Sequence, residues 1–130
     1  MIPTVAEHDD LEYFVGRKHP EELFLRLYAN DHTPAEGDTA ADYQEAKFAG
    51  YAPIPLRGIL WSKPNNLGIV YPRQTFTCAA GGQDEKVRGY FLTRAKTGTL
   101  AAAERFSDGP YAVETLGTLI HVTPTITKRR

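Results

Sequence analysis

The chain has 130 residues and a net charge of −1, which suits one domain and gives bulk electrostatics no reason to attract nucleic acid or an anionic membrane. A hydrophobic content of 42 % and a charged content of 24 % are typical of a soluble globular protein. The single cysteine, Cys78, can form neither an internal disulfide nor a zinc site by itself, so we expect folding in a reducing cytoplasm. The acidic start and the lack of a long apolar run predict neither a signal peptide nor a membrane helix.

Residues 1–21 are predicted to form an extended N-terminal arm. Residues 11–17 (LEYFVGR) have the apolar weight of a strand, and Pro20 ends it because proline lacks the N–H that a β-ladder needs. Such a segment either lies on a neighbouring molecule or is a frayed terminus. In the first case its apolar side chains would make the contact, namely Ile2, Val5, Tyr13 and Phe14.

Residues 23–29 alternate with period two, which predicts a half-buried strand. One face carries three leucines and should lie in the core. The other face holds two aromatic rings around an arginine and should be at most partly wet. The core face consists of Leu23, Leu25 and Leu27, and the other face of Phe24, Arg26 and Tyr28.

Residues 30–39 (NDHTPAEGDT) are rich in turn formers. Asp38 or Thr39 could cap a short helical segment over residues 40–47, where apolar side chains recur at helical spacing. We expect one or two helical turns, ended by Gly50.

Residues 51–61 (YAPIPLRGILW) read as an interrupted strand at a sheet edge, because Pro53 and Pro55 both lack an N–H. An edge blunted in this way resists unintended pairing with other chains. Trp61 follows, beside a polar loop. It could close one end of the fold, stack on a sugar ring or anchor a protein interface.

Further strands are predicted at residues 67–80 (in two parts), 86–95, 100–106, 111–115 and 118–127, with a hairpin turn at 96–99. Roughly eight short strands with frequent turn signals indicate an all-β fold, either an antiparallel β-sandwich or a jelly-roll-like barrel. We expect residues 22–130 to form one such domain, with the short helical segment near residues 40–47.

The sequence contains no recognisable catalytic, cofactor-binding or metal-binding motif, and we expect no enzymatic activity. The four histidines are scattered, and Asp31 with His32 is interpreted as a local hydrogen-bonding pair in a turn rather than as a metal site. Cys78 lies in an alternating strand, which favours a buried, inert thiol over a reactive one.

Several short runs resemble small virion proteins encoded among the structural genes of tailed bacteriophages. These runs are residues 25–34 (LRLYANDHTP), 38–39 (DT), 41–43 (ADY), 45–46 (EA), 48–52 (FAGYA), 89–93 (GYFLT) and 103–111 (AERFSDGPY). The resemblance covers roughly residues 23–127 and implies a non-enzymatic β-sandwich displayed in many copies on the virion after folding in the host cytoplasm.

On this basis we expect a head decoration (cement) protein that self-associates and binds the major capsid protein or another virion protein, with no nucleic acid, membrane or cofactor. The arm residues, Pro53, Pro55 and Trp61 are the expected interface. The alternative is a tail, neck or receptor-binding module that recognises a host-surface carbohydrate. Its ring platforms would be Trp61, Tyr71 and Tyr111, with Asn65 and Asn66 as polar partners.

Overall fold

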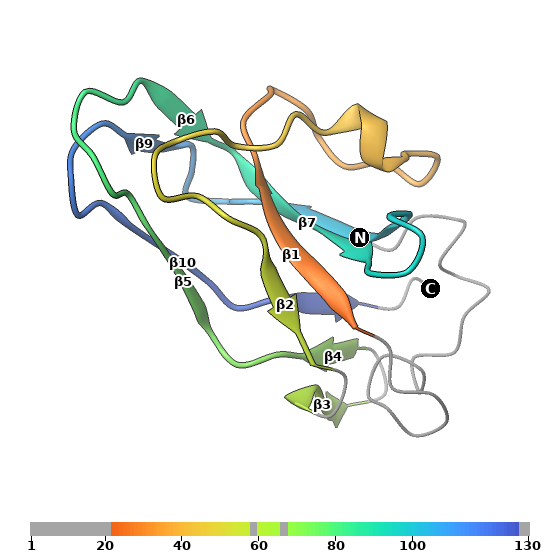
Figure 1. Ribbon diagram of the computed structural model, residues 1–130. Helices are drawn as coiled ribbons and strands as arrows, with labels where there is room; N and C mark the ends of the chain where they lie inside the picture. The colour runs from red at the N-terminus through yellow and green to blue at the C-terminus, as the bar shows by residue number, and fades with distance from the viewer. Residues whose placement is uncertain (1–21, 58–59, 66–67, 128–130) are drawn as a thin grey trace.

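The computed structural model describes residues 22–57, 60–65 and 68–127 (Figure 1). The predicted arm, with Ile2, Val5, Tyr13 and Phe14, lies outside these ranges. The described residues form antiparallel strands and a short 3-10 helix at Ala40–Asp42, which confirms the all-β class. None of the described residues form a helix long and apolar enough to cross a membrane.

One layer of the fold is a four-stranded antiparallel sheet in the order β2-β1-β7-β8. It consists of β2 (Ile54–Leu56), β1 (Leu23–Tyr28), β7 (Gly89–Arg94) and β8 (Leu100–Arg105). The long strands β1 and β7 pair along their whole length, from Leu23 opposite Arg94 to Tyr28 opposite Gly89. The expected hairpin joins β7 to β8, and Gly98 in its turn has a φ of 74°.

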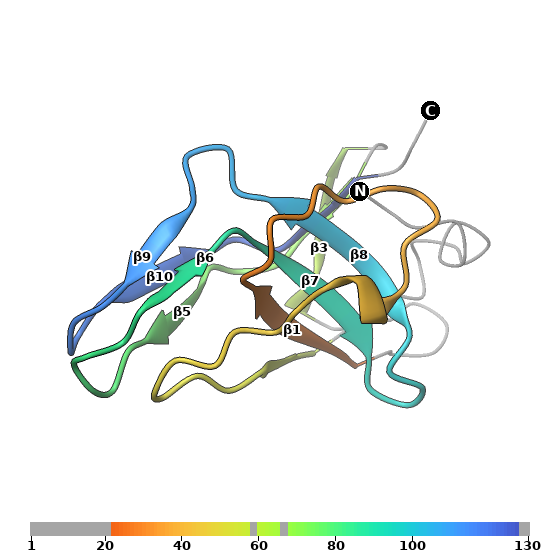
Figure 2. The same cartoon turned by 90° about the horizontal axis from the view of Figure 1, so that it is seen from above.

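The other layer consists of shorter strands that pair in small separate sheets (Figures 1 and 2). β5 (Gln74–Thr77) pairs with β10 (Leu119–Val122), and β4 (Gly68–Val70) pairs with both β11 (Thr125–Thr127) and β3 (Ser62–Asn65). β6 (Glu85–Val87) pairs with β9 (Tyr111–Val113) and extends the β7–β8 hairpin toward the far end of the molecule.

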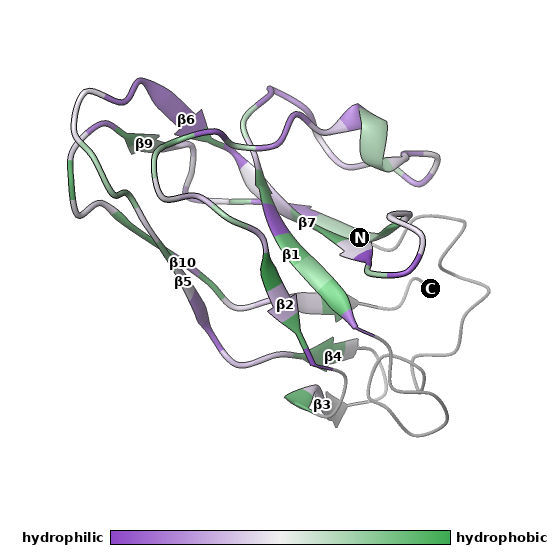
Figure 3. Cartoon of the chain, viewed as in Figure 1, coloured by the Kyte–Doolittle hydropathy of each residue, from purple (hydrophilic) through white to green (hydrophobic). Residues whose placement is uncertain are grey.

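The main hydrophobic core lies between these two layers. As predicted, the three leucines of β1 are fully buried in it, together with Leu92 of β7. The facing layer contributes alternate residues of its strands, as a pleated sheet with one buried face must. These residues are Ile69, Phe76, Ile120, Val122 and Ile126. Figure 3 shows β1 as hydrophobic over most of its length, with a hydrophilic section between.

The opposite face of the four-stranded sheet is buried as well. Residues 29–50, here called the strap, cross it and close a second, smaller core made of Tyr28, Tyr43, Phe91, Leu100 and Ala103. Tyr28 was expected on a partly wet face but is completely buried. The strap is therefore the element that turns an ordinary two-layer sandwich into one whose main sheet is covered on both sides.

The helical segment is shorter than expected. Only Ala40–Asp42 is helical, with Thr39 as its N-cap, whose N–H donates to the Asp42 carboxylate at 2.8 Å. Beyond it the strap is extended, because Glu45 bridges to Tyr28 and the Ala46 N–H donates to the carbonyl of Leu27 at 2.9 Å. Pairing with β1 thus replaces the helical turns predicted for residues 43–47, and Gly50 lies well beyond the end of the helix.

Two predicted strands are each broken into two. The strand at residues 86–95 is interrupted at Arg88, whose N–H donates to the carbonyl of Tyr28 while its own carbonyl accepts from Phe106. The strand at residues 118–127 is interrupted at Thr123 and Pro124, where the chain leaves β5 for β4. At both breaks the strand changes its partner, which hydrophobic alternation along one segment cannot reveal.

β2 lies at the edge of the four-stranded sheet, as the prolines predicted. Pro55 sits opposite Phe24 and is exposed, and Pro53 immediately precedes the strand. The edge is only three residues long and presents a proline to solvent, two devices that limit pairing with other chains.

Candidate functional site

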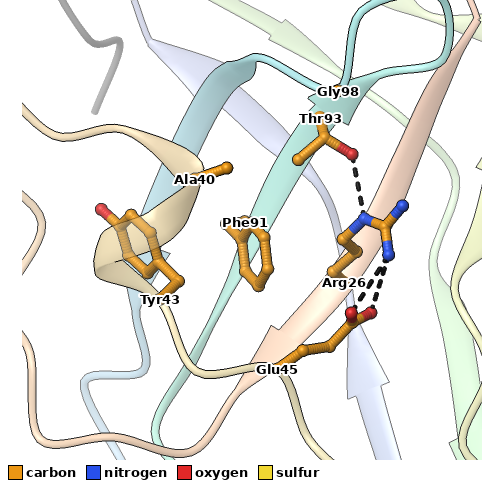
Figure 4. A pocket seen from close by; sticks show the side chains of 7 residues that line it. All are labelled: Arg26, Ala40, Tyr43, Glu45, Phe91, Thr93 and Gly98. Carbon is orange, nitrogen blue, oxygen red and sulfur yellow. Dashed lines mark hydrogen bonds and ion pairs between the residues drawn. The ribbon is translucent and has the colours of Figure 1, made fainter.

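The described structure contains an open depression of about 200 Å³ between the strap and the four-stranded sheet, here called the strap pocket. Figure 4 shows its lining, which comes from β1, β7, the strap and the β7–β8 turn. The lining residues are Arg26, Ala40, Tyr43, Glu45, Phe91, Thr93 and Gly98.

The apolar floor of the strap pocket is formed by two rings that hold each other in place. Tyr43 and Phe91 stack with their centroids 5.1 Å apart and their planes 17° apart. Tyr28 packs edge-on against Tyr43 at 5.0 Å. Only 6 % of Tyr43 and 3 % of Phe91 are exposed, so the floor offers ring edges and small areas rather than a whole ring face.

The polar side of the strap pocket is an ion pair. Nη1 of Arg26 donates to both oxygens of Glu45, at 3.1 and 3.0 Å, and Nε donates to Oγ1 of Thr93 at 2.9 Å (Figure 4). The side chains of Arg26 and Glu45 are 26 % and 34 % exposed. Because the two charges cancel, the pocket is close to neutral while retaining polar groups at its surface.

Tyr51 fixes the Glu45 carboxylate from the side of the main core. Its hydroxyl donates to Oε2 of Glu45 at 2.5 Å and accepts the N–H of Leu27 at 3.1 Å. Burial, and then the bond to Glu45, raise the pKa of Tyr51 well above its usual range, so the hydroxyl remains a donor at every physiological pH. The ion pair is thus held by Thr93 of β7 on one side and by Tyr51, just beyond the strap, on the other.

A second polar cluster lies within the strap and holds its outer part in one conformation. Oδ2 of Asp38 accepts from Nε2 of His32 at 2.7 Å, from the Tyr43 hydroxyl at 2.7 Å and from the backbone N–H of Ala35 at 2.9 Å. Burial alone would raise the pKa of Asp38, but the hydrogen bonds from Tyr43, His32 and Ala35 outweigh it and lower that pKa. The carboxylate therefore stays charged inside a nearly buried site.

The predicted local pair of Asp31 and His32 does not form. His32 turns to Asp38, and Asp31 pairs with Nη2 of Arg105 on β8 at 2.7 Å. The hydrogen bond and charge of Arg105 lower the pKa of Asp31. Asp38 lies further along the strap than His32, and Arg105 lies on a distant strand, so neither partner is the adjacent residue that the sequence suggested.

Trp61, expected at an interface or as a sugar platform, is only 5 % exposed. It packs edge-on against Tyr71 at 5.1 Å, and Tyr71 is itself 3 % exposed. Neither ring has a free face in this structure, and the interpretation of Trp61 as a lid over one end of the sandwich describes its position. Tyr111 is half-buried against Phe106. Asn66 and the side chain of Asn65 lie outside the described residues.

The described residues offer little support for a metal site or a reactive thiol. They contain no group of three or more His, Cys, Asp or Glu side chains placed to hold a metal ion. Cys78 is 1 % exposed and its thiol donates to the carbonyl of Ala80 at 3.1 Å, as a buried structural thiol would.

Sequence patterns did not single out the strap pocket. Arg26 stood out only as a polar residue between two rings, and Glu45 was assigned to a helix. The one usable signal was the pair of large rings flanking Arg26 on the strand face away from the core, since such a face needs a cover.

Comparisons with protein-family models, with curated proteins and with solved structures found no match to this chain. Function is therefore inferred from the residues, the fold and the strap pocket.

Proposed function

We propose that the chain is a non-enzymatic structural component of a bacteriophage virion, a capsid decoration protein that binds the capsid lattice in many copies. The proposal rests on the resemblance of residues 25–34, 89–93 and 103–111 to small virion proteins of tailed phages. It names the major capsid protein, or another virion protein, as the partner and places the chain on the particle after folding in the host cytoplasm.

The observation that best supports this proposal is the control of sheet edges and faces. β2 ends one side of the main sheet with an exposed proline, and the strap covers the face that a two-layer sandwich would leave open. A protein displayed at high local concentration must avoid random edge-to-edge pairing, and these two devices serve that need. They also leave assembly to the remaining surfaces, including the predicted arm with Ile2, Val5, Tyr13 and Phe14.

Binding to particles tests the proposal. Purified chain is added to capsids assembled without it, the particles are sedimented, and the bound chain is quantified. Saturable binding at a fixed ratio to the major capsid protein is the expected result. If the chain stays in the supernatant with intact particles at every concentration, the decoration role is wrong.

A second candidate function is carbohydrate recognition by a tail, neck or receptor-binding module. The strap pocket favours it, because a neutral Arg26–Glu45 pair beside an apolar floor suits an uncharged polar ligand. The platform predicted from Trp61 and Tyr71 does not, because both rings are buried. A glycan array probed with the purified chain, with no signal on any sugar, would remove this candidate.

A further inference from the structure

The size of the strap pocket limits what it can hold. Its volume of about 200 Å³ is below the range of roughly 300–1,000 Å³ that is usual for drug-sized ligands. An oligosaccharide or a nucleotide could therefore place only one small group in it. The exposed areas of Phe91 and Tyr43 are likewise too small for a sugar ring to stack on, so only a small apolar group could contact them.

The polar side of the pocket keeps hydrogen-bonding capacity that no described residue uses, namely a further acceptor position on Glu45 and N–H and O–H donors on Arg26 and Thr93. A carboxylate can accept about four hydrogen bonds. Oε1 of Glu45 accepts only from Nη1 of Arg26, whereas Oε2 also accepts from Tyr51. On the guanidinium, Nε and Nη1 are engaged, and Nη2 has no partner among the described residues (Figure 4).

The paired charges of the pocket disfavour strongly ionic ligands. Arg26 is neutralised by Glu45, so an anion would meet the carboxylate and a cation would meet the guanidinium. A neutral group that both donates and accepts a hydrogen bond, and that ends in a small apolar part, suits the size, the hydrogen-bonding groups and the charge of the pocket. An acetamido group has this chemistry, with an N–H for Glu45, a carbonyl for Arg26 and a methyl for the floor.

We propose that the strap pocket binds the acetamido group of an N-acetylated amino sugar. This inference develops the carbohydrate-binding candidate and does not depend on where the chain sits in a virion. The sugar ring would remain outside the pocket, over the rim formed by Ala40 and Gly98, and the acetamido group would enter between the ion pair and the Phe91 ring.

Gly98 provides a way to close the pocket without disturbing the fold. It has a φ of 74°, and a Cβ added to it would meet no atom within 4 Å. Asparagine tolerates this left-handed conformation better than other side chains, so Gly98→Asn should fold and narrow the rim. Gly82 is a matched control, since it also has a φ of 74° with open space around it but lies in the loop before β6, outside the pocket lining.

The test is an NMR titration of the full chain with N-acetylglucosamine, with N-acetylgalactosamine and with glucose. Both acetamido sugars should shift the amide signals of Phe91, Thr93 and Gly98, and glucose should not. Gly98→Asn should weaken binding by about tenfold or more, and Gly82→Asn should leave it unchanged. The proposal is overturned if these amides do not respond, if glucose acts as strongly as the amino sugars, or if Gly98→Asn binds like the unaltered chain. Each of these results would leave the particle-binding test of decoration unaffected.

Discussion

Removing one hydroxyl should measure how much the Asp38 cluster stabilises the folded strap. Tyr43→Phe keeps the ring that stacks on Phe91 and deletes only the hydroxyl that donates to Asp38 at 2.7 Å. A hydrogen bond to a charged group contributes about 1.5–3 kcal/mol. Asp38 keeps His32 and Ala35 as donors, so we expect a loss near the low end, about 1.5–2 kcal/mol.

The assay is equilibrium unfolding in urea followed by the fluorescence of Trp61, the one tryptophan of the chain. The midpoint should fall with an unchanged slope, because the variant alters stability rather than the area exposed on unfolding. For a chain of this length the corresponding drop in Tm is about 5–7 °C.

Tyr111→Phe is the matched control. Its hydroxyl also donates to an aspartate, Asp108, but that contact is exposed. Its loss should cost less than about 0.5 kcal/mol. Equal losses for Tyr43→Phe and Tyr111→Phe would refute the idea that the Asp38 cluster stabilises the folded strap.

The difference in stability between the unaltered chain and Tyr43→Phe is predicted to depend on pH. The pKa of Asp38 is lower in the folded chain than in the unfolded chain, so its contribution is complete above about pH 4, the ordinary pKa of aspartate, and is lost as the pH falls toward the folded value. The difference in stability between the unaltered chain and Tyr43→Phe should therefore shrink as the pH is lowered below about 4. A difference that grows on acidification would contradict the assignment of a charged Asp38.

Three other predictions concern backbone packing, the sheet edge and alkaline stability. Gly89→Ala should fail to fold or lose at least about 3 kcal/mol of unfolding free energy, because its Cβ would lie 2.3 Å from a backbone oxygen and 2.5 Å from Tyr28. Gly37→Ala is the control: its Cβ would meet no atom within 4 Å, so the same urea assay should show no change in stability. Pro55→Thr should keep the urea midpoint but increase the mass measured by light scattering at high concentration, and an unchanged mass would argue against the edge-guarding role. Burial raises the pKa of Tyr28 and Tyr90 to about 12, so the stability they contribute below about pH 10 should be lost as the pH rises toward 12. Unfolding free energies that stay constant over this range would contradict their burial.

Local patterns predicted the parts of the fold that depend on one strand and its own turn. Period two in β1 identified the buried leucines, and Gly98 marked the β7–β8 hairpin. The missing N–H groups of Pro53 and Pro55 identified the edge strand. In each case the physical cause lies within a few residues of the observed feature.

The strap and its pocket could not be predicted in this way. Period two shows that Tyr28 lies on the face opposite the leucines, but not that a distant segment covers that face. Glu45 appeared helical because its neighbours have helical spacing, yet its pairing with Tyr28 and its bond to Arg26 decide its conformation. These contacts join residues that are far apart in sequence, so no single segment contains the information.

The measurement that tests the proposed role most directly is quantitative mass spectrometry of mature virions purified from cells that produce this chain. A decoration protein should be present in each particle in many copies, at a constant ratio to the major capsid protein. Absence of the chain from the particles, with the protein recovered only from the soluble fraction, would contradict the proposal.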